Sequence, residues 1–218
     1  MNSKKKLLKN SRLYLILDKT ACGRKNTQKM LTDAIKGGID IVQIRDKTSS
    51  TRIFTQSASI LKKIAKKYHI PFIINDRVDI ALAIDADGVH LGQNDLPARL
   101  ARKLLGKDKI IGLSTHNLKQ VVAAQKEPID YLGFGPVFKT ATKPDLAPKG
   151  IKMLKSALKI SGLPIFPIGG IEEITLSAII NKNVVINRAA VCRPICKANN
   201  PRRSARVLKN RLTICTHN

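Results

Sequence analysis

Strand-like and helix-like segments alternate eight times along this chain, and the alternation limits the folds that it can adopt. Short apolar runs predict strands at 13–17, 39–43, 71–74, 88–91, 110–113, 131–134, 164–168 and 189–192. Apolar residues at helical spacing predict helices at about 27–36, 51–68, 78–84, 96–105, 118–125, 151–160, 172–180 and 201–211. Strand-then-helix units favour a parallel sheet with right-handed crossovers. Eight units in 218 residues predict an α/β protein, a single (β/α)8 or TIM barrel.

The composition suits one domain spanning residues 1–218. Hydrophobic residues make up 43% of the chain, but aromatic residues only 4%, so the core must consist of Ile, Leu, Val and Ala. No apolar run approaches the roughly 20 residues that span a bilayer. Residues 1–10 lack the apolar region of a signal peptide. We therefore expect a cytoplasmic protein with a flexible basic segment at 1–10, although a short basic targeting segment there stays an alternative.

The net charge of +25 comes from 40 basic and 15 acidic residues. Such an excess attracts polyanions, nucleic acid included. The basic residues are nevertheless spread over helix-like segments, without interleaved aromatic residues or a nucleic-acid-binding motif. We interpret them as a solvated outer ring of helices and expect no specific nucleic-acid partner and no membrane partner. The sequence leaves open whether the chain forms a homo-oligomer.

Four cysteines, at positions 22, 192, 196 and 215, show no CxxC spacing. Cys192 and Cys196 are separated by three residues, and no His or acidic residue lies near them in the sequence. Zinc sites usually show tighter cysteine pairs or neighbouring histidines. We predict reduced, partly buried thiols.

Polar residues follow most of the predicted strands, at 43–47, 75–76, 90–95, 114–116, 140–143 and 169–170. The carboxyl ends of the strands of a parallel barrel all lie on one face, so these groups should meet at its mouth. The segment 135–149 is the longest without a predicted helix or strand, and loops of that length tend to be functional.

Two carboxylates and three cations are the main candidates for chemistry at this mouth. Asp76 and Asp95 follow adjacent strands and could hold Mg²⁺, which prefers oxygen ligands; the alternative is that either one only caps the following helix. Arg45 and Lys47 alternate on one side of an extended segment together with Gln43, and Lys143 comes from the opposite rim. Such a set fits a diphosphate with its Mg²⁺. For each lysine alone, a solvated surface charge is the alternative.

Hydroxyl groups and bare backbone at other strand ends suit a phosphate. Thr140, Thr142 and Ser114 supply hydroxyls, and Gly169–Gly170 before a predicted helix start offers backbone N–H groups to an anion. A pair of glycines is also a plain turn. His90 and His116 lie beside strand ends, and we expect structural roles for them.

The motifs together resemble thiamine-phosphate synthase over residues 13–212. The segments that carry the resemblance are Gln-Ile-Arg-Asp-Lys at 43–47, Asn-Asp-Arg at 75–77, His-Leu-Gly-Gln at 90–93 with Asp-Leu-Pro at 95–97, Gly-Leu-Ser-Thr-His at 112–116, Gly-Pro-Val-Phe at 135–138 with Thr-Ala-Thr-Lys at 140–143, and Ile-Gly-Gly-Ile at 168–171. The resemblance implies that the chain joins 4-amino-2-methyl-5-(diphosphooxymethyl)pyrimidine to thiazole phosphate or its carboxylate, giving thiamine phosphate and pyrophosphate. Its partners would then be small phosphorylated substrates.

The resemblance also implies roles for individual residues. Asp76 and Asp95 would hold Mg²⁺, and Arg45, Lys47, Ser114 and Lys143 would be catalytic. The pyrimidine diphosphate would contact Gln43, Ile44, Arg45, Asp46, Lys47, Asn75, Ser114 and Lys143. The thiazole phosphate would contact Thr140, Ala141, Thr142, Gly170, Cys192 and Arg193. In this family the carbon–oxygen bond of the pyrimidine is thought to ionise first, so no protein nucleophile is expected.

The chain departs from the family around the eighth strand. The usual Gly-Ala-Asp-Gly turn is replaced by Asn-Val-Val-Ile-Asn-Arg at 183–188, and the usual Val-Ser pair aligns with Cys192–Arg193. Arg193 could grip the phosphate with its guanidinium, or it could crowd the pocket. We favour the first interpretation because Arg193 adds complementary charge.

Two rival functions are weighed against the synthase. One is a thiazole tautomerase-like relative of the same barrel family, against which Gln43, Asp95 and the 140–143 loop argue. The other is a non-catalytic basic nucleic-acid-binding protein, against which the scattered bases and the paired carboxylates argue.

Overall fold

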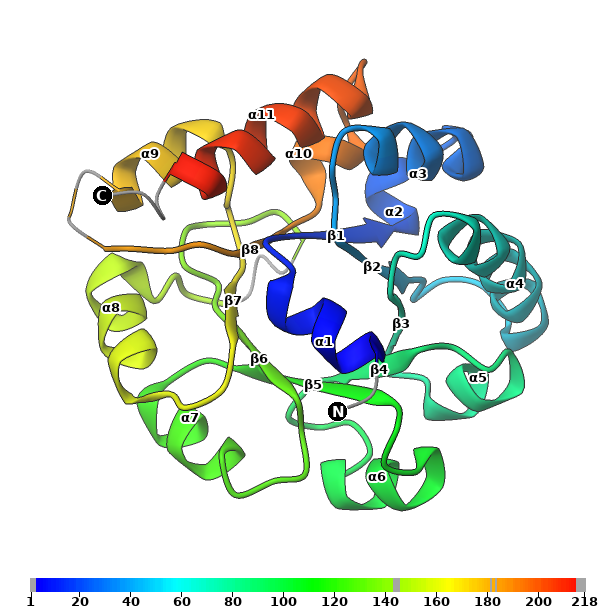
Figure 1. The fold of residues 1–218 in the computed structure, drawn as a ribbon, viewed down its shortest axis with the longest axis horizontal. Coiled ribbons are helices and arrows are strands. Elements are labelled where there is room, and N and C mark those ends of the chain that lie inside the picture. The colour runs from blue at the N-terminus through cyan, green and yellow to red at the C-terminus, as the bar shows by residue number, and fades with distance from the viewer. Residues whose placement is uncertain (1–2, 143–145, 181, 183, 215–218) are drawn as a thin grey trace.

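The computed structural model describes residues 3–142, 146–180, 182 and 184–214. Eight parallel strands form one sheet that curves into a barrel surrounded by helices (Figure 1). The strands are β1 (Leu13–Asp18), β2 (Ile41–Arg45), β3 (Phe72–Asn75), β4 (Gly88–Leu91), β5 (Ile110–Thr115), β6 (Tyr131–Phe134), β7 (Ile165–Pro167) and β8 (Ala189–Val191). The predicted TIM-barrel class is confirmed.

The helices follow the strands in the expected order. They are α1 (Ser3–Asn10), α2 (Lys19–Cys22), α3 (Thr27–Lys36), α4 (Thr51–Lys67), α5 (Val78–Ala83), α6 (Ala98–Leu105), α7 (Leu118–Ala124), α8 (Gly150–Ile160), α9 (Glu173–Ile180), α10 (Arg193–Cys196) and α11 (Pro201–Ile214). Side-chain caps fix several starts: Asn26, Ser50 and Asn117 each accept a hydrogen bond from the backbone of the helix that follows. Within the described part of the chain, no helix is long and apolar enough to cross a membrane.

Two layers of apolar side chains build the core. The inner layer fills the barrel and includes Tyr14, Ile41, Ile73, Tyr131 and Phe166. The outer layer lies between the strands and the helices, and consists mainly of Ile, Leu, Val and Ala. Three aromatic residues meet inside the barrel, where Phe166 stacks edge-on against Tyr14 and Tyr131 at ring-centroid distances of 5.3 and 5.5 Å.

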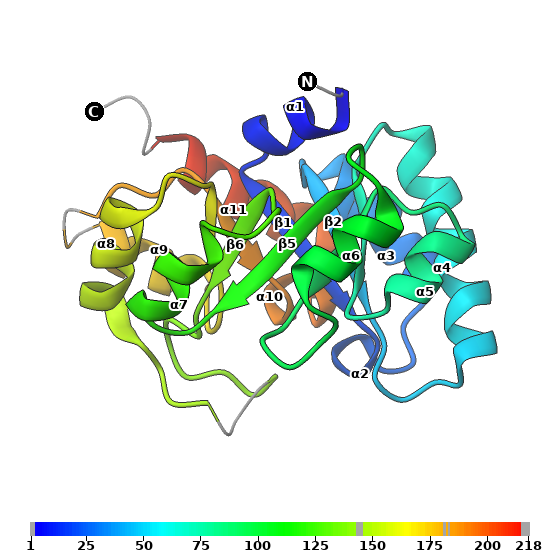
Figure 2. The same cartoon turned by 90° about the horizontal axis from the view of Figure 1, so that it is seen from below.

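The N-terminal segment is not the flexible tail that we expected. Residues 3–10 form α1, which covers one end of the barrel, while α2 lies at the opposite end (Figure 2). Leu8 is only 2% exposed and belongs to the inner apolar layer. Burial of this side chain holds the segment against the barrel. The sequence of residues 3–10 was too short and too basic to predict this helix.

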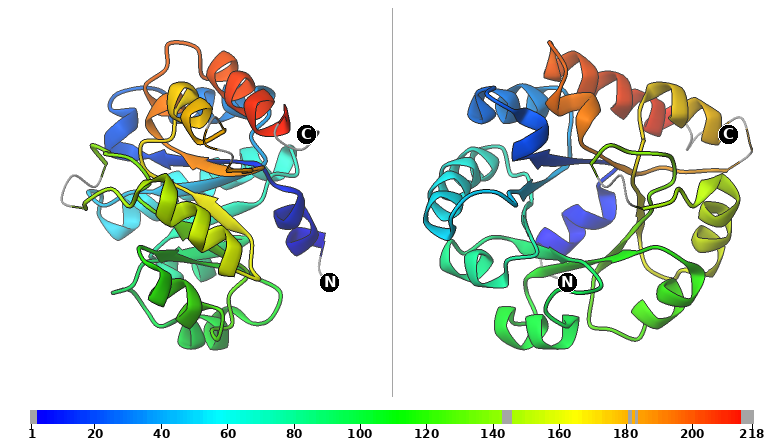
Figure 3. Two further views of the ribbon diagram at one scale, coloured as in Figure 1. Left: turned by 90° about the vertical axis from the view of Figure 1, so that its left-hand side faces the viewer. Right: turned by 180° about the vertical axis from the view of Figure 1, so that it is seen from behind.

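The short helices α2 and α10 were not predicted. Each has only four residues and follows directly on β1 or β8. Asp18 caps α2 by accepting a hydrogen bond from the Ala21 backbone at 2.8 Å. These helices lie at the carboxyl ends of β1 and β8, so they help to shape the barrel mouth (Figure 3).

In the part of the chain that the structure describes, the hydrogen bonding of the sheet is interrupted between β7 and β8. Hydrogen-bonded ladders join each strand from β1 to β6 to the next one along the chain, and β1 also pairs with β8. No ladder joins β7 to β8 among the residues that the structure describes. The two strands are nevertheless neighbours, and the barrel is almost closed.

Candidate active site

A cavity of about 520 Å³ opens at the carboxyl ends of the strands. It gathers side chains from loops and strands that lie far apart in the sequence. The sequence-predicted residues that line it are Gln43, Arg45, Asn75, Ser114, Thr140, Ala141, Thr142, Gly170, Cys192 and Arg193. The convergence expected for a parallel barrel is thus present in the structure.

Strand β2 sends alternate side chains into this cavity. Gln43 and Arg45 line it, whereas Ile44 is buried in the outer apolar layer. Arg45 forms an ion pair with Asp18, whose side chain is 3% exposed. Asp18 was not among the predicted site residues, and it holds the Arg45 guanidinium at the mouth.

Asp46 has a structural task in the loop after β2. Its carboxylate accepts hydrogen bonds from the backbone N–H groups of Thr48 and Ser49, at 3.0 and 2.9 Å. Burial alone would raise the pKa of Asp46, but the hydrogen bonds from Ser49 and Thr48 and the charge of Lys19 lower that pKa to about 2. The side chain of Asp46 therefore shapes the loop that carries Lys47.

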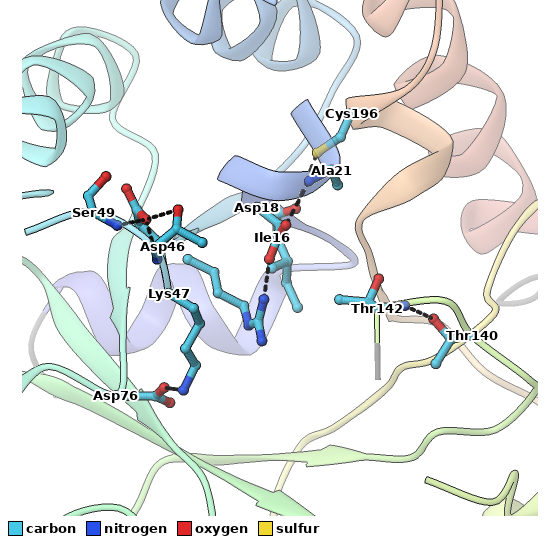
Figure 4. A network of polar contacts seen from close by, with 12 residues as sticks. Ile16, Asp18, Ala21, Asp46, Lys47, Ser49, Asp76, Thr140, Thr142 and Cys196 are labelled. Atoms are coloured by element: carbon cyan, nitrogen blue, oxygen red, sulfur yellow. Dashed lines mark hydrogen bonds and ion pairs between the residues drawn. The ribbon is translucent and has the colours of Figure 1, made fainter. Parts of the chain in front are cut away.

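Lys47, Asp76 and Asp95 form a charged cluster in the loops after β2, β3 and β4, and none of the three is among the residues that line the cavity. Lys47 makes an ion pair with Asp76, as Figure 4 shows. Burial and hydrogen bonding to Asp76 raise the pKa of Asp95. Asp76 has a φ of 61°, a backbone conformation that is uncommon for residues other than glycine and that functional sites often contain.

Neither aspartate caps the helix that follows it. Helices α5 and α6 begin after Arg77 and Pro97, and neither start has a side-chain cap. Asp95 instead accepts a hydrogen bond from the Gly92 backbone at 2.6 Å. No group of three or more His, Cys, Asp or Glu side chains with metal-binding geometry occurs within the described ranges. Two carboxylates alone suit Mg²⁺, which completes its shell with water and substrate oxygens.

The opposite side of the mouth carries hydroxyls and tight glycine turns. The Thr142 backbone donates to Thr140 Oγ1 at 3.3 Å, and Figure 4 shows this pair across the opening from Lys47 and Asp76. Gly170 has a φ of 64°, and a Cβ there would lie 2.7 Å from the Lys139 carbonyl oxygen. Only glycine fits this close approach of the two loops.

The last part of the predicted phosphate site comes from β8 and α10. Cys192 follows β8, and Arg193 opens α10, and both line the same cavity as Gly170. Cys22, Cys192 and Cys196 are free thiols, as expected. Lys143 and Cys215 lie outside the described residues.

A mostly buried chain of polar side chains that line the cavity was missed by the sequence analysis. It links Gln43, Tyr14, Tyr131, His90 and Ser114 across the inside of the barrel. His116 has a separate partner, the Gly135 carbonyl oxygen, 2.6 Å from its Nδ1 atom. The signal that could have revealed the chain is the occurrence of tyrosines at inward positions of aliphatic strands, with glycines at 112 and 133 on the neighbouring strands.

The comparisons with known proteins agree with this geometry. A family model described as thiamine monophosphate synthase matches residues 13–195. The thiamine-phosphate synthase of Persephonella marina is 43% identical over 198 residues, which cover 91% of this chain and 94% of the relative. That of Clostridium acetobutylicum is 45% identical over 79% of this chain and 82% of the relative.

The chain belongs to the thiamine monophosphate synthase family. The thiamine phosphate pyrophosphorylase of Pyrococcus furiosus superposes with a TM-score of 0.84 at 30% identity, covering 98% of this chain and 99% of that structure. A geranylgeranylglyceryl phosphate synthase from Thermoplasma acidophilum shares the fold, with a TM-score of 0.69 at 13% identity. Membership of the thiamine monophosphate synthase family supports an enzyme over the rival function of a non-catalytic nucleic-acid-binding protein.

Proposed function

We propose that the cavity condenses 4-amino-2-methyl-5-(diphosphooxymethyl)pyrimidine with thiazole phosphate or its carboxylate, forming thiamine phosphate and pyrophosphate. In this reaction the methylene–oxygen bond breaks, the electron pair leaves with pyrophosphate, and a bond forms between the methylene carbon and the thiazole nitrogen. The observation that carries the proposal is the cluster of Lys47, Asp76 and Asp95 beside a cavity whose far side has the hydroxyls and the tight turn suited to a second phosphate.

Asp76 and Asp95 would hold Mg²⁺. The raised pKa of Asp95 beside Asp76 and the Lys47 ammonium against Asp76 both mark a position where a cation is favoured. Bound Mg²⁺ would neutralise charge that develops on the leaving pyrophosphate. Two carboxylates leave room for phosphate oxygens in the metal shell, which is typical of Mg²⁺ sites.

The cations of the chain would stabilise the departing group. The guanidinium of Arg45 is held by Asp18 and lines the cavity, so it can bind a phosphate without reorganising. Lys47 is about half exposed and would turn from Asp76 to the diphosphate when a metal takes its place. Lys143 is proposed as the third cation. These contacts strengthen as charge develops, so they favour the transition state over the substrate.

Gln43, Asn75 and Ser114 would bind and orient the pyrimidine from the floor of the cavity. Ile44 and Asp46 would contribute through their backbone, because the Ile44 side chain lies in the outer layer and the Asp46 carboxylate is engaged in its loop. The thiazole phosphate would occupy the opposite side, against Thr140, Ala141, Thr142, Gly170, Cys192 and Arg193.

Pyrophosphate release from the two substrates, with Mg²⁺ and with EDTA, tests the proposal. We expect release coupled to thiamine phosphate formation only with the metal, and a loss of at least about 100-fold in kcat/KM for Asp76→Ala and Asp95→Ala. The control is Asp108→Ala, which deletes a carboxylate in the loop after α6. This variant should retain activity. Full turnover in EDTA would contradict the metal assignment, and isomerisation of the thiazole without pyrophosphate release would favour the tautomerase-like alternative.

A further inference from the structure

The hydrogen-bonded chain that lines the cavity connects two residues proposed to touch the pyrimidine. Gln43 Nε2 lies 2.8 Å from the Tyr14 hydroxyl, which lies 2.8 Å from the Tyr131 hydroxyl. The Tyr131 hydroxyl lies 2.9 Å from His90 Nδ1, and His90 Nε2 lies 2.9 Å from Ser114 Oγ. Gln43, Tyr14 and Tyr131 are nearly or fully buried, at 2%, 1% and 0% exposure.

The barrel interior is built to admit this chain. A Cβ on Gly112 would lie 2.1 Å from Tyr131 Cζ, and a Cβ on Gly133 would lie 3.1 Å from His90 Cε1. Gly112 is in register with His90 on β4 and with Tyr131 on β6, and Gly133 is in register with Ser114 on β5. Space has thus been made for two polar side chains where the rest of the inner layer is mostly apolar.

The direction of the chain follows from its first donor. An amide nitrogen can only donate, so Gln43 donates to the Tyr14 oxygen. If each buried hydroxyl is to use its hydrogen, Tyr14 donates to Tyr131 and Tyr131 donates to His90 Nδ1. Burial raises the pKa of both tyrosines, so each keeps its hydrogen. His90 then carries its own hydrogen on Nε2 and donates it to Ser114 Oγ.

We propose that Tyr131 is a positioning residue which, through His90, leaves the Ser114 hydroxyl hydrogen free to donate to a ring nitrogen of the pyrimidine. In the opposite chain direction Ser114 would donate to His90 and could only accept from a ligand. Tyr14 and Gln43 set the direction from the other end of the chain. The inference rests on the proposed function, because it assigns a task to a residue of that same pyrimidine site.

The tautomer of His90 tests the direction of the chain directly. In ¹⁵N spectra of the imidazole, assigned with His90→Gln, we expect a neutral ring with hydrogen on Nε2 in the wild-type protein. Tyr131→Phe removes the donor to Nδ1 and should shift the population toward the other tautomer. The third tyrosine of the protein, Tyr68, lies at the end of α4, outside the hydrogen-bonded network. Tyr68→Phe should therefore leave the tautomer of His90 unchanged. Hydrogen on Nδ1 in the wild-type protein would overturn the proposal.

Ligand selectivity supplies the functional readout. The probes are the pyrimidine diphosphate with a methylene in place of its bridging oxygen, in a 4-amino form and a 4-oxo form; the second replaces a ring acceptor by an N–H donor. We expect the wild-type protein to bind the 4-amino form at least about tenfold more tightly than the 4-oxo form. Tyr131→Phe and Tyr14→Phe should each reduce this ratio of the two dissociation constants severalfold. Thermal unfolding of each variant shows that the ratio is measured on folded protein.

The outcomes separate this inference from the proposed function. An unchanged ratio in folded Tyr131→Phe, with normal pyrophosphate release by the wild-type protein, would overturn the positioning role and leave the synthase activity standing. A reduced affinity ratio in Tyr131→Phe, without any thiamine phosphate formation by the wild-type protein, would support the positioning role of Tyr131. The same result would overturn the proposed reaction. Failure of the wild-type protein to bind either probe would overturn both.

Discussion

Asp95 is a residue at which folding and the proposed metal binding make opposite demands. Burial and the neighbouring Asp76 raise its pKa, so the folded protein holds a proton there more tightly than the unfolded chain does. The free energy of unfolding therefore falls as pH rises from the ordinary pKa of an aspartate through the raised pKa. Mg²⁺ binding needs the deprotonated carboxylate and becomes tighter over the same range.

Asp95→Asn should remove this dependence. The variant keeps an oxygen for the Gly92 backbone but carries no charge, so we expect it to lose less stability than the wild-type protein between about pH 4 and pH 7. Urea unfolding at several pH values, with and without Mg²⁺, measures the difference. Mg²⁺ should stabilise only the wild-type protein, and parallel pH profiles for the two proteins would contradict the assignment.

Arg193 replaces the serine that the family usually has after the eighth strand. Because Arg193 lines the same cavity as Gly170, we expect Arg193→Ala to weaken thiazole phosphate binding by about tenfold and leave the KM for the pyrimidine diphosphate nearly unchanged. Titration calorimetry with thiazole phosphate and steady-state kinetics check the two halves. Tighter binding by the variant would show that Arg193 crowds the pocket.

The elements of the barrel could be predicted where hydrophobic spacing decides them. All eight strands and the longer helices came from this pattern, with ends shifted by at most three residues; β2 begins later than predicted and includes Arg45. The short helices α2 and α10 and the buried helix α1 could not be predicted, because four to eight residues carry too little periodicity. The same limit hid the ion pair between Asp18 and Arg45.

Helix α1 meets an unusual residue at the base of the barrel. Arg188 donates to the Lys9 carbonyl oxygen at 3.4 Å and lies over the Phe166 ring, but its buried Nη1 atom has no hydrogen-bond partner among the residues that the structure describes. Burial lowers the pKa of Arg188, with the nearby charge of Arg12 acting in the same direction.

Replacing this guanidinium by an apolar group should stabilise the protein. We expect Arg188→Leu to raise the free energy of unfolding by about 1 kcal/mol, because a poorly satisfied, partly buried charge is removed. Thermal unfolding measures the change. Arg206→Leu on the exposed side of α11 is the matched control and should alter stability little. A lower stability of Arg188→Leu would mean that the contact with Phe166 and α1 outweighs the desolvation.

The charge of the whole molecule bears on how substrates reach the mouth. A net charge of +25 creates a field that attracts both anionic substrates from solution. Raising the salt concentration screens this field, since the Debye length falls to about 8 Å at physiological ionic strength. We expect kcat/KM for the pyrimidine diphosphate to fall by roughly tenfold from low to physiological ionic strength, mainly through KM. A kcat/KM that does not depend on salt would contradict steering by the field.

For the molecule as a whole, the position of the cavity could be predicted from the sequence, because parallel strands of a barrel bring their carboxyl ends together on one face. It did not show which polar residues line the cavity and which stand on its rim, since that depends on the side toward which each loop turns. Asp46 illustrates the limit: it lies within the predicted motif, yet its carboxylate is engaged by its own loop.

The missing ladder between β7 and β8 also bears on how the chain could be divided. Val185 is 71% exposed, and a cut beside it would interrupt none of the ladders described. The smaller fragment would retain β8, which pairs with β1, and α11, which packs against α3. Residues 1–185 and 186–218, expressed as separate polypeptides, should therefore reassemble, and the protein offers a natural place at which to build a split reporter.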